Sequence, residues 1–315
     1  MKPSLVVNDS NAKPFVEIVG GRRDGDLVGI TDGETSLKEK PDLQPFLAEL
    51  KPRLKPREIA VVENDVSRAL REDREPTEAV AKAVYREVLK APSKPASSLE
   101  IHDGCFQPVF GHDTANNRVA YIFGPAGAGK STAARMLVDS WRQKHKKGQV
   151  YIFSRFSADS DDSLKIKGAD YFDEKEMLSH IAETGAAIKC DNLETPCLVL
   201  CDDYDSFNTK AYNACAESIR DFLENGRKFG VSLVITSHLA VDKARPLLRT
   251  VWNESHLIGL FPAATQGRAG KYALDAYVGL DKQQIQKLLK LRSRCVWIRK
   301  PFPQAIASQH EIYLL

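Results

Sequence analysis

The residues with the clearest chemistry form a glycine-rich loop between an apolar strand and an amphipathic segment. Residues 124–131 have the sequence G-P-A-G-A-G-K-S, which matches the pattern G-x-x-x-x-G-K-S. In such a loop backbone N–H groups point at phosphate oxygens, the lysine reaches the β- and γ-phosphates, and the serine hydroxyl binds Mg²⁺. The sequence therefore predicts an ATP site made by Gly124, Pro125, Ala126, Gly127, Ala128, Gly129, Lys130, Ser131 and Thr132, with Ser131 as a ligand of Mg²⁺.

An acidic pair, Asp202 and Asp203, follows the continuous apolar run of residues 197–201. Such a run is typical of a fully buried parallel strand. At this position the first acid is expected to hold Mg²⁺ through water, and the second to accept a proton from the attacking water. The simpler alternative is that the two acids only end a strand.

Two further positions could act on the γ-phosphate. The strand expected at residues 231–236 ends in Thr236, Ser237 and His238, where a polar side chain could sense that phosphate, or could simply hydrogen-bond the strand end. Arg227 lies in N-G-R-K-F-G, which predicts a turn before that strand. An arginine there could neutralise transition-state charge in a neighbouring subunit, or could be a solvated surface residue.

The elements expected to position these residues alternate between strands and helices from residue 99 onward. This alternation predicts an α/β fold, the three-layer P-loop NTPase sandwich with a mostly parallel central sheet. Asp281 stands where a helix N-cap is expected. The expected strands are 119–123, 150–153, 197–201, 231–236, 256–261 and 295–298, and the expected helices are 132–146, 210–223 and 281–291.

A proline- and serine-rich stretch at residues 92–98 is typical of a linker. It divides the chain into an N-terminal accessory region, residues 1–98, and a P-loop ATPase domain, residues 99–315. The accessory region is expected to be a small α+β unit, with strands within 14–30 and helices within 41–54 and 77–90. Residues 1–99 hold seventeen Lys/Arg and seventeen Asp/Glu, so this region is not a basic DNA-binding arm.

Composition indicates an intracellular globular protein. The 315 residues are 43% hydrophobic and 28% charged, no apolar run is long enough to span a membrane, and the N-terminus lacks the apolar core of a signal peptide. Six scattered cysteines form no C-x-x-C pair and are expected to be reduced core thiols. The net charge of +3 does not by itself indicate a nucleic-acid partner.

The chain carries a series of motifs at residues 122–131, 151–155, 200–203, 226–227, 234–238, 252–254 and 260–262. Taken in order, these motifs resemble those of the poxvirus-type genome-packaging ATPases of large DNA viruses, a branch of the FtsK/HerA superfamily. The resemblance spans roughly residues 115–315. It implies an additional-strand P-loop core, ATP hydrolysis with Mg²⁺, a homo-oligomeric ring, and double-stranded DNA driven into a capsid.

The same resemblance implies roles, partners and a location. Lys130 and Ser131 would bind phosphates and Mg²⁺, Asp202 and Asp203 would form the hydrolytic pair, and Arg227 would act in trans. Double-stranded DNA, further copies of the chain and capsid proteins are the expected partners, with no membrane. The expected location is the host-cell cytoplasm, a viral factory or the virion.

Two positions depart from the superfamily pattern. Many relatives have Glu where this chain has Asp203, and many have Gln at the tip of the strand that here ends in Thr236, Ser237 and His238. Two other functions stay open: a P-loop kinase or phosphotransferase acting on a small molecule, and a nucleotide-binding regulatory protein with little turnover. The acidic pair and the resemblance favour the DNA translocase.

Overall fold

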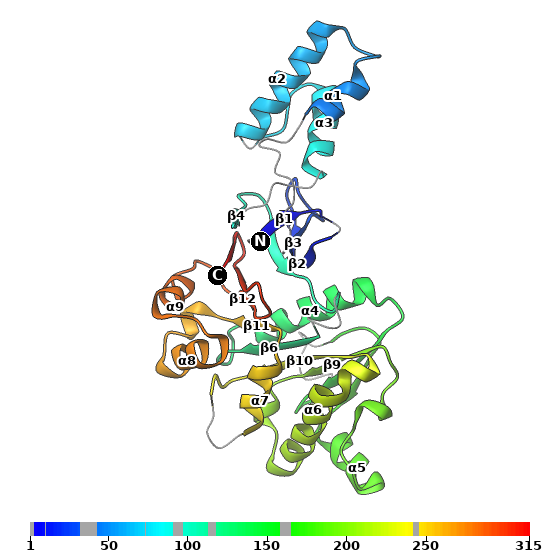
Figure 1. Cartoon of the computed structure of the whole chain (residues 1–315). Coiled ribbons are helices and arrows are strands. Elements are labelled where there is room, and N and C mark those ends of the chain that lie inside the picture. The colour runs from blue at the N-terminus through cyan, green and yellow to red at the C-terminus, as the bar shows by residue number, and fades with distance from the viewer. Residues whose placement is uncertain are drawn as a thin grey trace. The chain divides into compact units, whose positions relative to one another are not determined.

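The computed structural model describes residues 3–9, 11–31, 43–72, 74–90, 97–112, 118–157, 165–241 and 246–315. The chain divides into two compact units, residues 1–105 and residues 106–315 (Figure 1). The boundary expected from the linker composition, 98/99, is a few residues earlier, and residues 91–96 of that linker lie outside the described residues. Residues 159–162, whose sequence D-S-D-D predicts an acidic, solvated loop, lie outside them as well.

The first unit combines a small antiparallel sheet with three helices. Strand β3 (Leu27–Thr31) pairs with β2 (Lys13–Val19), and these two correspond to the strands expected within 14–30. Strand β1 (Ser4–Val7), which also pairs with β3, was not expected. The helices are α1 (Gln44–Leu50), α2 (Pro56–Glu72) and α3 (Ala79–Lys90). Helix α2 was not expected; it forms because Val62, Val66 and Ala69 share one face, which packs with Val84 and Tyr85 of α3. The short strand β4 (Ser98–Glu100) follows, and β5 (Cys105–Pro108) begins at the last residue of this unit.

The second unit is built on a mixed sheet with the order β14-β13-β12-β11-β6-β10-β9-β7-β8. Strands β11, β6, β10, β9, β7 and β8 are parallel, and β12 to β14 continue the sheet antiparallel. Strand β10 (Val231–Ser237) lies between β6 (Val119–Phe123) and β9 (Cys197–Cys201), which is the additional-strand arrangement. The other strands are β7 (Gln149–Phe153), β8 (Ala169–Phe172), β11 (Leu257–Leu260), β12 (Val296–Arg299), β13 (Ala305–Ala307) and β14 (Glu311–Leu314).

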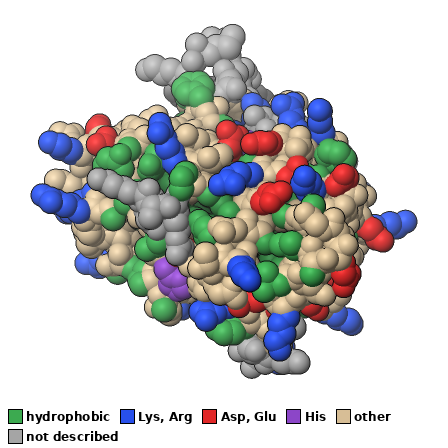
Figure 2. Space-filling model, turned by 90° about the horizontal axis from the view of Figure 1, so that it is seen from below, with side chains coloured by type: hydrophobic (Ala, Val, Ile, Leu, Met, Phe, Trp, Pro, Cys, Tyr) green, Lys and Arg blue, Asp and Glu red, His purple; other side chains and the backbone are tan. Residues whose placement is uncertain are grey.

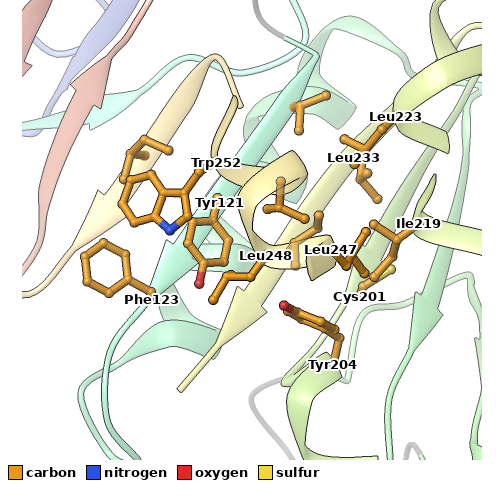
Figure 3. Packing of buried hydrophobic residues seen from close by; sticks show 14 of the residues in the cluster. Tyr121, Phe123, Cys201, Tyr204, Ile219, Leu223, Leu233, Leu247, Leu248 and Trp252 are labelled. Carbon is orange, nitrogen blue, oxygen red and sulfur yellow. The ribbon is translucent and has the colours of Figure 1, made fainter. Parts of the chain in front are cut away.

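Helices cover both faces of this sheet, so the fold is the predicted three-layer α/β sandwich (Figure 1). Helix α4 (Lys130–Lys144) packs on one face, and α6 (Thr209–Phe229) and α7 (Pro246–Glu254) pack on the other. On the second face Trp252 lies 5.2 Å, ring centre to ring centre, from both Tyr121 and Phe123 (Figure 3). The remaining helices are α5 (Glu174–Thr184), α8 (Arg268–Ala273), a π-helical turn (Leu274–Val278) and α9 (Lys282–Leu289), which Asp281 caps as expected.

Helix α6 corrects one expectation. The segment 225–230 was expected to be a turn, but α6 continues to Phe229, and Gly230 ends it in the left-handed conformation with φ 72°. The helix continues because its buried face, which includes Phe222 and Leu223, extends to Gly226. A Cβ on Gly226 would lie 2.7 Å from Nη1 of Arg118, so glycine serves close packing there rather than a turn.

The cysteines behave as expected. All six are free thiols, and Cys190, Cys197, Cys201 and Cys215 are buried. Burial raises the pKa of the Cys197 thiol to about 12, which keeps it protonated and unreactive. Among the described residues, no helix is both long and apolar enough to cross a membrane.

Candidate nucleotide site

The phosphate loop connects β6 to α4 at the carboxyl edge of the parallel strands. Gly127 and Gly129 have φ of 74° and 112°, values that glycine adopts readily and L side chains rarely do. Helix α4 begins directly after Gly129, so its first backbone N–H groups lie at the loop, where a phosphate can accept hydrogen bonds from them. The N–H of Gly124 donates to the carbonyl of Ser237 at 3.1 Å, which ties the loop to the end of β10.

Lys130 lies within the loop rather than on the surface, with 5% of its side chain exposed. Its Nζ donates to the carbonyl oxygen of Pro125 at 3.3 Å and lies 3.3 Å from Oδ1 of Asp203. The ammonium group is therefore positioned between the phosphate loop and the acidic pair. From there it can attract the terminal phosphates of a bound nucleotide.

The acidic pair is held by Thr236 at the end of the neighbouring strand. The Thr236 hydroxyl donates to Oδ1 of Asp202 at 2.8 Å and accepts the N–H of Asp203 at 2.7 Å. Thr236 is fully buried and Asp202 is 6% exposed. One hydroxyl thus fixes both acids, so the polar end of β10 is part of the site.

Asp203 is the more accessible acid and has an unusual backbone. Its φ of 40° and ψ of 47° place it in the left-handed region, which few non-glycine residues occupy but which Asp tolerates. This turn directs its carboxylate toward the Lys130 ammonium and the His238 imidazole: Oδ1 lies 3.3 Å from Nζ of Lys130, and Oδ2 lies 3.4 Å from Nε2 of His238. Asp203 is therefore positioned where a proton acceptor could face the terminal phosphate.

His238 is itself held by Asp205, whose side chain is 4% exposed. The backbone N–H of His238 donates to Oδ2 of Asp205 at 3.1 Å, and Nδ1 of the ring lies 3.7 Å from Oδ1. The ligand atoms of Asp203, Asp205 and His238 lie within 4.8 Å of one another and could hold a metal ion. For Mg²⁺, which prefers oxygen ligands, the Ser131 hydroxyl and the Asp202 carboxylate fit better than a site that includes an imidazole.

The structure brings most of the sequence-predicted hydrolytic and sensor residues together, and leaves Ser237 and Arg227 outside their network. Lys130, Asp202, Asp203, Thr236 and His238 form one contact network. The Ser237 hydroxyl instead accepts the N–H of Leu239 at 3.0 Å, as a strand-end cap does.

Arg227 is the residue that stands apart. It is exposed in the last turn of α6, at the edge of the sheet where β10 begins. The phosphate loop lies at the opposite edge, so the two are separated by the length of β10, roughly 20 Å for seven residues.

Two residues of the site were not predicted from the sequence. Asp205 could have been found, since it lies in the same loop as the acidic pair and only two residues after Asp203. Arg294 could not, because only the topology brings the loop before β12 to the phosphate loop, where Nε of Arg294 donates to the carbonyl of Ala128 at 3.1 Å.

Known proteins match this chain in sequence and in fold. Residues 113–240 match the AAA domain family. The uncharacterized protein V3 of the Sputnik virophage is 31% identical over 213 residues, which cover 67% of this chain and 81% of V3.

Among solved structures, the genome packaging NTPase B204 of Sulfolobus turreted icosahedral virus 2, in complex with ATP-gammaS, is 13% identical with a TM-score of 0.40. That match covers 61% of this chain and 97% of B204. The cytoplasmic domain of the type VII secretion ATPase EccC of Thermomonospora curvata is 11% identical with a TM-score of 0.40, covering 68% of this chain and 28% of EccC. Structural similarities at these identities and TM-scores do not show what this chain does.

The fold and the loop, lysine and acidic pair define a P-loop ATPase. The chain belongs to the family that includes protein V3 of the Sputnik virophage. The predicted α/β class, with its mostly parallel sheet, is confirmed by the strand order. The additional-strand core that the resemblance to FtsK/HerA-type packaging ATPases implies is present, with β10 between β6 and β9.

Proposed function

We propose that this protein hydrolyses ATP with Mg²⁺ to move double-stranded DNA, and that the DNA is a viral genome entering a capsid. The observation that carries the proposal is the position of Asp203, whose carboxylate lies 3.3 Å from the loop lysine and is held by the turn after β9. A second acid beside the metal-binding acid suits activation of water. The sequence motifs and their order support the DNA-packaging role.

The chain's own residues divide the work of hydrolysis. The phosphate loop and Lys130 bind the phosphates, and Lys130 neutralises charge that develops on them. Ser131 and Asp202 would hold Mg²⁺, which supplies electrostatic stabilisation of the phosphate oxygens. Asp203 orients a water molecule and accepts its proton, while Thr236 fixes the acids and His238 contacts the outer oxygen of Asp203.

Assembly into a ring would supply the one expected group that this site lacks. Arg227 belongs to the far edge of its own sheet, and an arginine side chain cannot span the roughly 20 Å length of β10. If Arg227 assists hydrolysis, it acts in the site of a neighbouring subunit. We therefore include a homo-oligomeric ring in the proposal, with capsid proteins as further partners.

An ATPase assay with and without double-stranded DNA tests the proposal. We expect double-stranded DNA to stimulate ATP hydrolysis. We also expect the protein to move in one direction along the duplex while it hydrolyses ATP. Transfer of the γ-phosphate to a small acceptor, without an effect of DNA, would instead identify a phosphotransferase. Tight ATP binding with negligible turnover under both conditions would identify a nucleotide-binding regulator.

A further inference from the structure

A helical insertion connects β11 to β12 and begins and ends at the edge of the sheet that carries the phosphate loop. Strand β11 ends at Leu260, which pairs with Val296 at the start of the antiparallel β12. Leu260 also pairs with Phe123, the last residue of β6 before the phosphate loop. The intervening residues form α8, the π-helical turn and α9. The insertion therefore lies beside the nucleotide site at both of its ends.

Residues 268–294 of this insertion, which we call the basic segment, have a net charge of +5, which exceeds the net charge of the whole chain. The segment has two acids, Asp275 and Asp281, and seven Lys/Arg residues, whereas the net charge of the whole chain is only +3. Figure 2 shows blue side chains predominating along its left side, the side on which Figure 1 draws α8 and α9, while red and blue mix on the right. The seven cations are Arg268, Lys271, Lys282, Lys287, Lys290, Arg292 and Arg294, and all are exposed.

These cations are not neutralised locally. Within the described ranges, none of the seven makes an ion pair with a carboxylate. Lys287 lies 3.7 Å from the ring centre of Tyr313, and Asp281 uses its carboxylate to cap α9. Exposed, unpaired cations along one segment create a positive field that attracts a polyanion.

The basic segment also contacts the phosphate loop directly. Arg294 donates from Nε to the carbonyl of Ala128, and its guanidinium lies 3.2 Å from where a Cβ on Gly129 would stand. At the other end of the insertion, a Cβ on Gly124 would lie 2.7 Å from the ring of Phe261. The loop is thus packed between the two ends of the insertion, so a shift of the insertion must be accommodated by the loop.

We propose that the basic segment is the surface that binds the phosphate backbone of double-stranded DNA, and that Arg294 is the positioning residue through which bound DNA acts on the phosphate loop. This inference rests on the proposed DNA-translocating function. A repeating polyanion suits a series of lysines and arginines spread over two helices. A membrane surface suits the segment less well, because Tyr272 is the only large hydrophobic residue that it exposes among the described residues.

The test compares two variants that each replace three exposed lysines with glutamine. Lys271→Gln/Lys282→Gln/Lys290→Gln removes charge from the basic segment, and Lys146→Gln/Lys147→Gln/Lys175→Gln removes the same charge elsewhere. We expect the first variant to bind duplex DNA at least about tenfold more weakly. The slope of the logarithm of its binding constant against the logarithm of salt concentration should be less steep by about 0.9 for each lost phosphate contact. Its ATPase rate without DNA should match the wild-type rate, and the second variant should bind DNA like the wild type.

A third variant, Arg294→Gln, separates binding from coupling. Its affinity for DNA should stay within about threefold of the wild-type affinity, because at most one contact is lost. Most of the stimulation of its ATPase activity by DNA should nevertheless be lost. Full stimulation in Arg294→Gln overturns the role of Arg294. Equal loss of DNA affinity in both lysine variants overturns the basic segment as the binding surface, and so does wild-type affinity in the first.

The two proposals fail in distinguishable ways. If the wild-type protein hydrolyses ATP but neither binds nor responds to duplex DNA, the proposed function is wrong and the inference falls with it. If the wild type responds to DNA while the basic-segment variant responds equally well, the function stands and only the assigned surface is wrong.

Discussion

The hydroxyl of Thr236 donates a 2.8 Å hydrogen bond to the carboxylate of Asp202, across the boundary between neighbouring strands β10 and β9. The same hydroxyl accepts the backbone N–H of Asp203. Any displacement of the end of β10 therefore changes the hydrogen bonds that hold both acids. This arrangement gives the strand end a means to affect catalysis without contacting the nucleotide itself.

Replacing Thr236 with valine tests this link. Thr236→Val keeps the shape but removes the hydroxyl that donates to Asp202 and accepts the N–H of Asp203, and hydrogen bonds to charged groups contribute about 1.5–3 kcal/mol. We expect turnover to fall about tenfold or more, as measured by phosphate release at saturating ATP. Thr236→Ser retains the hydroxyl and should stay within about threefold of wild type; equal losses in both variants would contradict the hydrogen-bond explanation.

Lys130→Ala should abolish hydrolysis and weaken ATP binding. The substitution removes the cation that the loop holds 3.3 Å from Asp203, beside the position of the terminal phosphates. Loss of one charge-stabilising donor predicts a turnover at least about a hundredfold lower. Steady-state ATPase rates and titration with a fluorescent ATP analogue measure the two effects, and wild-type turnover would exclude this loop as the catalytic site.

The two acids should give different defects. Asp203→Asn keeps a residue that tolerates the left-handed backbone but loses the proton acceptor, so ATP should bind while turnover stops. Asp202→Asn should instead weaken the Mg²⁺-dependent part of ATP binding. Binding measured with Mg²⁺ and with EDTA distinguishes them, and equal loss of affinity in both variants would refute this division of roles.

Mixing two inactive variants tests the trans role of Arg227. Arg227→Ala should bind ATP normally yet hydrolyse it slowly, and Lys130→Ala should lack hydrolysis of its own. In mixed oligomers some interfaces would combine an intact phosphate loop from the first variant with an intact arginine from the second, so partial activity should return. If native mass measurement confirms mixed oligomers and no activity returns, Arg227 is a solvated surface residue.

Arg118→Met should destabilise the second unit. The buried guanidinium of Arg118 donates to the carbonyls of Phe222 at 2.8 Å and Leu223 at 3.0 Å, near the end of α6. Methionine fills the space but removes these hydrogen bonds from a charged donor, which predicts a free energy of unfolding lower by about 3 kcal/mol. Trp141, Trp252 and Trp297 all lie in this unit, so tryptophan fluorescence in urea reports its unfolding alone. Arg118→Lys should cost less, because it keeps one donor.

Much of the ATPase fold follows from local sequence. The apolar runs of β6, β9 and β10 are long, and the glycine pattern of the phosphate loop fixes the order of strand, loop and helix. The expected end of α6 was wrong because Gly226 suggests a turn, whereas its absent side chain makes room for Arg118, more than one hundred residues earlier in the chain. No local pattern encodes such a contact.

The site was less predictable than the loop for the same reason. The involvement of Thr236 could be expected from its position at a strand end, but its bond to Asp202 depends on the register between β9 and β10. Arg294 and the basic segment reach the nucleotide site only because β12 runs antiparallel to β11. A net charge of +3 for the whole chain hides this uneven distribution.

The left-handed backbone of Asp203 also limits which acid this position can accept. Asp and Asn tolerate this conformation because their short polar side chains can hydrogen-bond locally, whereas the longer Glu would carry a conformational penalty. The turn and the side-chain length are therefore matched, because the turn itself brings the short carboxylate to Lys130 and His238. Asp203→Glu would alter both the backbone conformation and the position of the carboxylate.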